Sequence, residues 1–237
     1  MGRRQDRSPL ALPDVPMTSI TRFLSRPVAG LLATALAATL ALPASADGLS
    51  SLETFMRTAR TGRADFTQVV TAPAREGEAP RSKRSEGTFE FQRPGHFRFV
   101  YSKPFAQTLV ADGRTLWLYD VDLQQVTARD QAQALGSTPA ALVASSADIK
   151  ALQKDFTLVS EPERDGQQWV LATPRTKDGQ LQHVRVGLKG DQLASLDILD
   201  SFGQRSVLNF NNVQANAAIP ASSFVFTPPA GVSVVKQ

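Results

Sequence analysis

The stretch that decides the fold is Phe89-Glu90-Phe91-Gln92-Arg93-Pro94-Gly95-His96-Phe97-Arg98-Phe99. Phenylalanines alternate with other residues on both sides of the Pro-Gly pair, and alternation with period two is typical of a β-strand with one buried face. Only four residues, 93–96, connect the two alternating runs. The stretch therefore predicts an antiparallel hairpin whose two strands share an aromatic face.

Alternation of this kind continues along the chain. It predicts about eleven or twelve strands, over residues 63–71, 85–93, 96–102, 107–111, 114–120, 124–129, 156–161, 168–174, 181–189, 192–199 and 205–214, with another near 224–226. Short turns such as Asp112-Gly113 and Asp165-Gly166 separate them, which favours an antiparallel meander. Because so many strands rarely form a flat open sheet, we expect a mainly β fold, an incomplete antiparallel β-barrel of about eleven strands.

Helical patterns are few. Apolar residues at helical spacing predict an amphipathic helix over residues 48–61, capped by Ser50 or Ser51 and ending near Gly62. One or two further short helices are expected between residues 136 and 153, where Thr138-Pro139 precedes an apolar run. Residues 72–84 contain two prolines and four basic residues, which indicates a polar, mobile loop. The helices are too few to cover both faces of the sheet, so we expect them to plug or cover one side.

The first 46 residues resemble a secretory signal peptide. Arg22 and Arg26 precede a weakly polar run over residues 28–42, which is too short to span a bilayer, and Ala44-Ser45-Ala46 supplies small residues for cleavage after Ala46. Met17 is a possible alternative start. We therefore expect one mature domain over residues 47–237, located in the periplasm.

Charge and cysteine content exclude several classes of protein. The formal charge of the 237-residue chain is +4, but residues 1–46 contain five basic and two acidic residues, which leaves 21 basic against 20 acidic residues in the mature chain. A net charge of +1 gives no electrostatic case for nucleic-acid binding. Without cysteine, the chain forms no disulfide and carries no lipid on a cysteine. We expect a soluble monomer that meets membrane surfaces only transiently.

The sequence contains no convincing catalytic or metal-binding arrangement. His96 and His183 are the two histidines, and neither has a partner at metal-ligand spacing. Asp197 with Asp200, and Asp120 with Asp122, are more typical of turns than of an acid–base pair. Gly-x-Ser-x-Gly and Gly-x-x-x-x-Gly-Lys motifs are both missing. We therefore expect no enzymatic activity, no cofactor and no metal, and any energy source must lie in a partner.

Aromatic residues are concentrated in one part of the chain. Eight of the sixteen aromatic residues of the mature chain lie between Phe89 and Tyr119, and Leu116 and Leu118 alternate with Trp117 and Tyr119. These residues fit a filled barrel core, and they also fit the lining of an apolar cavity for a hydrophobic ligand. Periodicity alone does not distinguish the two arrangements.

Several motifs together resemble the outer-membrane lipoprotein carrier family, LolA. The first is the 89–99 stretch, followed by Leu109-Val110-Ala111-Asp112-Gly113-Arg114-Thr115-Leu116-Trp117-Leu118-Tyr119. Asp65-Phe66-Thr67-Gln68 is similar to the family's first-strand motif, and Thr138-Pro139 to the start of its lid helix. Phe224-Val225-Phe226-Thr227-Pro228-Pro229-Ala230-Gly231-Val232 resembles its C-terminal signature. These motifs span nearly the whole mature chain in the family's order.

The resemblance implies an incomplete barrel of eleven strands whose apolar cavity lies under a helical lid. It also implies a periplasmic chaperone that accepts acylated lipoproteins from an ATP-driven inner-membrane ABC complex and carries them to the outer-membrane receptor LolB. That receptor shares the fold but is itself a lipoprotein. Because this chain has no cysteine to carry a lipid, the resemblance favours the carrier over the receptor.

The resemblance also assigns roles to individual residues. Arg93 corresponds to the arginine that hydrogen-bonds lid backbone groups and holds the empty cavity closed, a role that suits the five donors of a guanidinium. Phe97 corresponds to an aromatic residue near the cavity mouth. The expected cavity lining comprises Phe89, Phe91, Phe97, Phe99, Tyr101, Leu116 and Leu118, and the expected lid helix contains Pro139, Leu142 and Val143.

Other interpretations stay open at this point. The cavity could serve another lipid or amphiphile, or the chain could be an adaptor whose aromatic core is simply full. The chain ends soon after Val235, so the C-terminal extension of some relatives is short or absent here.

Overall fold

The computed structural model describes residues 47–74, 77–134, 146–176 and 179–237. The expected signal peptide and Pro139, Leu142 and Val143 of the expected lid helix lie outside these residues. The described residues form twelve strands: β1 Thr61–Thr71, β2 Ser82–Gln92, β3 His96–Lys103, β4 Gln107–Asp112, β5 Thr115–Asp120, β6 Gln125–Asp130, β7 Phe156–Arg164, β8 Gln167–Pro174, β9 Leu181–Lys189, β10 Gln192–Asp200, β11 Arg205–Ala215 and β12 Ser233–Lys236.

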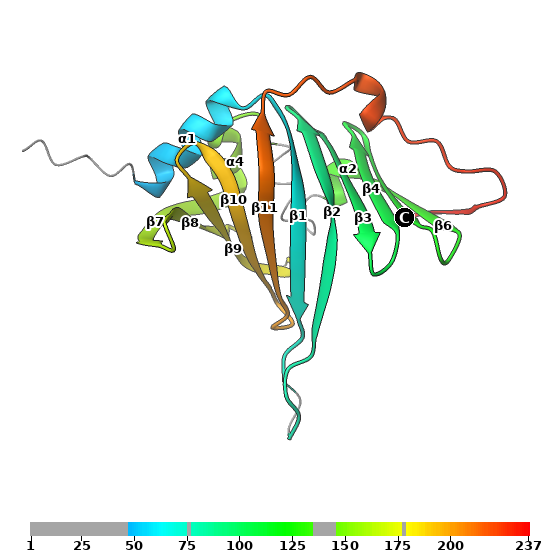
Figure 1. Ribbon diagram of the computed structural model, residues 1–237, viewed down its shortest axis with the longest axis horizontal. Helices are drawn as coiled ribbons and strands as arrows, with labels where there is room; N and C mark the ends of the chain where they lie inside the picture. The colour runs from blue at the N-terminus through cyan, green and yellow to red at the C-terminus, as the bar shows by residue number, and fades with distance from the viewer. Residues whose placement is uncertain (1–46, 75–76, 135–145, 177–178) are drawn as a thin grey trace, which may run out of the picture. The chain divides into compact units, whose positions relative to one another are not determined.

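All twelve strands belong to one curled sheet (Figure 1). Its order is β12-β6-β5-β4-β3-β2-β1-β11-β10-β9-β8-β7, and every pairing is antiparallel except that of β12 with β6. The sheet ends at β12 and at β7, which do not pair with each other, so the barrel is incomplete. The fold class expected from the sequence is therefore confirmed.

Helix α1, Gly48–Thr58, covers one side of the sheet. Its buried residues Leu52, Phe55 and Met56 belong to the same apolar core as residues of β8, β9 and β10. The helix ends earlier than expected, because the chain turns at Ala59 and Gly62 already belongs to β1. Its cap also differs from the expectation: the Asp47 carboxylate, rather than Ser50 or Ser51, accepts a hydrogen bond from a first-turn amide.

The other helices are short. They are α2 Gln131–Ala134, α4 Ile149–Asp155 and the 3₁₀ helix η2 Ala221–Phe224. Asp148 caps α4 by accepting a hydrogen bond from the Ala151 amide, and α4 contacts α1 and β7. This helix fulfils part of the expectation for residues 136–153; the rest of that segment lies largely outside the described residues.

The strand expected near residues 224–226 is wrong. Residues 221–224 form η2, and the twelfth strand lies further along the chain, at β12. The phenylalanines of this segment contact the outer face of the sheet instead: Phe226 lies 5.6 Å from Trp117 between ring centroids, and Phe224 lies 5.8 Å from the His96 ring. Alternation around Phe224 and Phe226 thus reflects packing onto a sheet and not membership of it.

The expected 72–84 loop is shorter than expected, because β2 begins at Ser82 and includes Lys83 and Arg84. The pairing of Thr71 with Ser82 extends the β1–β2 ladder to this point. Strand geometry therefore sets the positions of Lys83 and Arg84, the basic residues near the start of β2.

Asp112 organises the turn between β4 and β5. Its carboxylate accepts hydrogen bonds from the Arg114 amide at 2.9 Å, the Thr115 amide at 2.7 Å and the Trp117 indole at 2.9 Å. Partial burial alone would raise the pKa of Asp112, but these hydrogen bonds, with a smaller contribution from His96, outweigh it and hold the pKa below its ordinary value.

We expect Asp112→Ala to lower the free energy of unfolding by roughly 1–2 kcal/mol at pH 7. A carboxylate whose pKa is depressed by folding stabilises the fold fully above its unfolded pKa, about 3.9, and loses that effect as the pH falls through the folded value. The difference between wild type and variant should therefore be constant above about pH 5 and shrink below about pH 4. Urea denaturation at several pH values measures it. Asp191→Ala, at an exposed turn, is the control and should change stability by less than about 0.5 kcal/mol.

Candidate functional site

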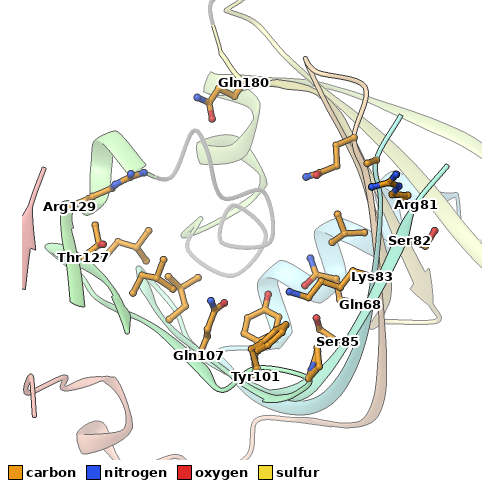
Figure 2. Close-up of a pocket in the computed structure, with 18 residues that line it drawn as sticks. Gln68, Arg81, Ser82, Lys83, Ser85, Tyr101, Gln107, Thr127, Arg129 and Gln180 are labelled. Atoms are coloured by element: carbon orange, nitrogen blue, oxygen red, sulfur yellow. The ribbon is translucent and has the colours of Figure 1, made fainter. Parts of the chain in front are cut away.

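The inner face of the curled sheet surrounds a pocket of about 700 Å³ (Figure 2). Its apolar lining is Val70, Ala72, Tyr101, Pro104, Phe105, Leu109, Leu116 and Leu118. Its polar lining is Gln68, Arg81, Ser82, Lys83, Ser85, Gln107, Thr127, Arg129, Gln180 and Gln204. The volume is within the range of pockets that hold one drug-sized ligand.

Three of the seven expected cavity residues line this pocket. They are Tyr101 from β3 and Leu116 and Leu118 from β5, two strands that flank β4 in the sheet. Leu118 is 39% exposed, which is unusual for a leucine on the inner face of a sheet. Figure 2 shows Tyr101 pointing into the pocket. Burial raises the pKa of Tyr101 to about 12, so its hydroxyl stays protonated and is a hydrogen-bond donor.

The other four expected cavity residues lie in the packed core and not in the lining of this pocket. Phe89, Phe91, Phe97 and Phe99 are at most 5% exposed, and Phe97, expected near the mouth, is 0% exposed. Phe89 and Phe99 stack with ring centroids 4.4 Å apart. In this structure the filled-core interpretation therefore holds for these four rings, while a role in contacting a ligand stays a prediction.

Arg93 lies in a buried position between the helices and the start of β3. Its Nε donates to the Ala59 carbonyl at 3.0 Å, and its Nη1 donates to the Ser146 carbonyl at 2.9 Å. The guanidinium carbon lies 5.0 Å from the Phe55 ring centroid and 5.3 Å from that of Phe91. Burial, with a smaller effect of the Arg60 charge, lowers the pKa of Arg93 to about 10, so the side chain stays cationic at neutral pH.

These contacts make Arg93 a bridge between two segments far apart in the sequence. Ala59 is the residue at which α1 ends, and Ser146 lies just before α4. The expected Thr138-Pro139 segment lies outside the described residues; within them, the Ser146 contact relates Arg93 to the region of the expected lid. Its role as a latch stays a prediction.

The residues weighed as catalytic candidates have structural partners. Nη1 of Arg185 donates to Nε2 of His183 at 2.6 Å, and burial together with Arg185 lowers the pKa of His183. Asp197 accepts two hydrogen bonds from Arg205, at 2.8 and 2.9 Å. Asp200 accepts from the turn amides of Phe202 and Gln204.

The remaining candidates are similar. His96 contacts the Pro94 carbonyl at 2.8 Å, and Asp120 accepts from Gln107 and from the Leu123 amide. Among the residues that the structure describes, no group of three or more His, Asp or Glu side chains is placed to hold a metal ion. The same residues include no helix with the length and apolar character needed to cross a membrane.

Sequence reasoning missed most of the polar lining. Gln68 and Lys83 point into the pocket from β1 and β2 (Figure 2). Continuing the alternation of Phe89 and Phe91 back along β2 places Ser85 and Lys83 on the same face, so the pattern itself could have identified them. The interpretation of residues 72–84 as a loop hid this signal.

Comparison with known proteins finds a matching family model and similar proteins. The family model "Outer membrane lipoprotein carrier protein LolA" matches residues 57–227. An outer-membrane lipoprotein carrier protein of Albidiferax ferrireducens is 64% identical over 198 residues, which cover 82% of this chain and 93% of that protein. One of Leptothrix cholodnii is 49% identical over 194 residues, covering 82% of this chain and 88% of that protein.

Solved structures include a LolA superfamily protein, NE2245 from Nitrosomonas europaea. It is 13% identical to this chain, with a TM-score of 0.45, and the match covers 77% of this chain and 99% of that one.

Proposed function

Because the chain belongs to the outer membrane lipoprotein carrier family LolA, we propose that it takes acylated lipoproteins from an ATP-driven inner-membrane ABC complex and delivers them to the receptor LolB. The family consists of periplasmic lipoprotein carriers and not of enzymes. The observation that carries the proposal is the 64% identity to a lipoprotein carrier protein over 82% of the chain. The named partners and the direction of transfer are the proposed part.

The pocket supports this function. Its apolar lining, which includes Tyr101, Leu116 and Leu118 on the inner face of the sheet, suits an acyl chain. We propose that the core rings Phe89, Phe91, Phe97 and Phe99 contribute to the cavity when the lid opens, with Pro139, Leu142 and Val143 in the lid. We also propose that residues 1–46 are removed and that residues 47–237 act as a monomer.

Energetics require that the cargo be incompletely buried. Burial of an acyl chain is worth about 0.8 kcal/mol per CH₂, so three chains of roughly fifteen methylenes would give on the order of 35 kcal/mol. Non-covalent affinities reach only about 20 kcal/mol, and a carrier must also release its cargo. A pocket of about 700 Å³ agrees with partial burial. The cost of opening the closed state further reduces the net gain.

A soluble-release assay tests the proposal. The processed protein, residues 47–237, is added with ATP to proteoliposomes that contain the inner-membrane complex loaded with a lipoprotein. We expect acylated lipoprotein in a soluble one-to-one complex with the carrier, which size exclusion and mass spectrometry detect. Release that is no greater than without carrier, from a protein shown by circular dichroism to be folded, would contradict the proposal.

A further inference from the structure

The inner face of β2 changes character along the strand. Its inward-facing residues run from the buried Phe91 and Phe89, past Gly87, to Ser85 and Lys83 in the pocket. Arg81 is the residue immediately before β2, and it also lines the pocket. The inner face of β2 therefore passes from the packed aromatic core to a cationic part of the pocket lining.

Charge in the pocket is entirely of one sign. Among its eighteen described lining residues, three are cationic and none is acidic. Two of the cations have other partners: Arg81 forms a 3.0 Å ion pair with Glu78, and Nε of Arg129 donates to Gln237 at 2.8 Å. Lys83 is the remaining one and is therefore the cation best placed to bind a ligand.

Lys83 contacts an apolar residue of the lining. Its Nζ is 4.4 Å from the centroid of the Phe105 ring. A competing carboxylate is that of Asp120, which interacts electrostatically with Lys83 but accepts hydrogen bonds from the Gln107 side chain and the Leu123 amide. Those hydrogen bonds hold the carboxylate at the end of β5, so the ammonium can still bind an anion in the pocket.

Tyr101 adds a hydrogen-bond donor to the same pocket. Its hydroxyl makes no hydrogen bond to any residue that the structure describes, and Figure 2 shows Tyr101, Gln68 and Lys83 all directed into the pocket. Because burial keeps the hydroxyl protonated, it offers a proton to a ligand oxygen. A lysine and a neutral phenol together suit a phosphate or carboxylate better than an uncharged ester.

We propose that the pocket recognises an anionic group, a phosphate or a carboxylate, attached to an acylated ligand. The anion binds Lys83 and Tyr101, and the acyl chain lies along Leu109, Leu116 and Leu118. This inference rests on the proposed function, since it assumes that the pocket takes acyl chains. It adds that the pocket distinguishes ligands by charge at the point where the chain joins the rest of the molecule.

A pair of C12 amphiphiles tests the charge preference. Dodecyl phosphate and monolauroyl glycerol have the same chain length and differ in head-group charge. Below their micellar concentrations, isothermal titration calorimetry should show the phosphate binding about fivefold more tightly, which is what one solvent-accessible ion pair of about 1 kcal/mol provides. Added salt should reduce the preference.

The chain offers a closely matched control. Lys83 and Arg84 are neighbours on β2, both exposed, and the alternation of the strand directs Arg84 to the opposite face. Lys83→Glu should abolish the preference for dodecyl phosphate and leave monolauroyl glycerol binding unchanged. Arg84→Glu makes the same change in net charge and should keep the preference. Equal binding of both amphiphiles by the wild type, or equal loss in both variants, would overturn the proposal.

A second experiment distinguishes the source of the anion. Two triacylated lipopeptides, one with glutamate and one with glutamine near the modified cysteine, are compared on the wild type and on Lys83→Glu. A preference for glutamate that Lys83→Glu removes assigns the site to the cargo's own peptide. A preference seen only with dodecyl phosphate assigns it to a free anionic lipid. If acyl ligands bind without any charge preference, this inference fails while the carrier function stands.

Discussion

Replacing Phe99 with alanine is expected to lower the free energy of unfolding by about 4 kcal/mol, the range found for buried phenylalanines. The Phe99 side chain is 2% exposed and lies centrally among aromatic rings. Its ring centroid is 4.4 Å from that of Phe89, 5.4 Å from that of Phe66 and 6.1 Å from that of Phe97. Since β2 and β3 are held by ladder pairing, the sheet cannot close the resulting gap. Urea denaturation followed by circular dichroism measures the loss.

Phe202→Ala is the control for this experiment. Phe202 is 73% exposed in the turn between β10 and β11, so its removal should change stability by less than about 0.5 kcal/mol. A loss below about 1 kcal/mol for Phe99→Ala would mean that the ring does not belong to a well-packed core. That result would contradict the packed-core assignment and support the expectation from the sequence that Phe99 lines the cavity.

The sequence predicted the strands well, because two independent local signals agreed. Alternating side chains defined each strand, and residues with special turn conformations ended it. Leu181–Lys189 matches its predicted bounds, and Gln192–Asp200 extends only one residue beyond them. Between these two strands Gly190 has a φ of +60°, which glycine adopts without strain. Local sequence patterns therefore sufficed to predict most strands of the barrel.

Long-range effects account for the errors. The alternation around Phe224 and Phe226 predicted a strand, but the two rings pack on the outer face of β3–β5 instead. Strand β12 is four residues long and is held by its pairing with β6. No local sequence pattern predicts that pairing.

The candidate site was only partly predictable for the same reason. Alternation identifies which residues of a strand share a face, but it does not tell how far along that face the packed core extends. Phe99 and Tyr101 are two residues apart on the inner face of β3, yet the first is core and the second lines the pocket. That boundary depends on the curvature of the whole sheet and on the position of α1.

Arg93→Leu is expected to leave the protein folded and able to load cargo but to reduce transfer to the receptor about tenfold. As a latch, Arg93 would stabilise the closed state through its hydrogen bonds to the carbonyls of Ala59 and Ser146, and hydrogen bonds to charged groups are worth about 1.5–3 kcal/mol each. These hydrogen bonds must break when cargo enters, and they form again when the cargo leaves and the cavity closes. Without these hydrogen bonds, the loaded carrier is favoured more strongly over the empty carrier. A tenfold effect on transfer corresponds to at least about 1.4 kcal/mol. Leucine keeps apolar contact with Phe55 and Phe91, so the fold should survive.

Two further variants make the test of Arg93 specific. Arg93→Lys keeps the charge but not the planar fork that reaches two carbonyls, so transfer should fall between wild type and Arg93→Leu. Arg57→Leu removes an exposed arginine from α1 and should transfer cargo normally. Transfer is measured as lipoprotein moved from purified loaded carrier to immobilised receptor over time, with thermal denaturation confirming that each variant is folded. Normal transfer by folded Arg93→Leu would refute the latch, because a residue that holds the empty state closed must change how readily cargo leaves.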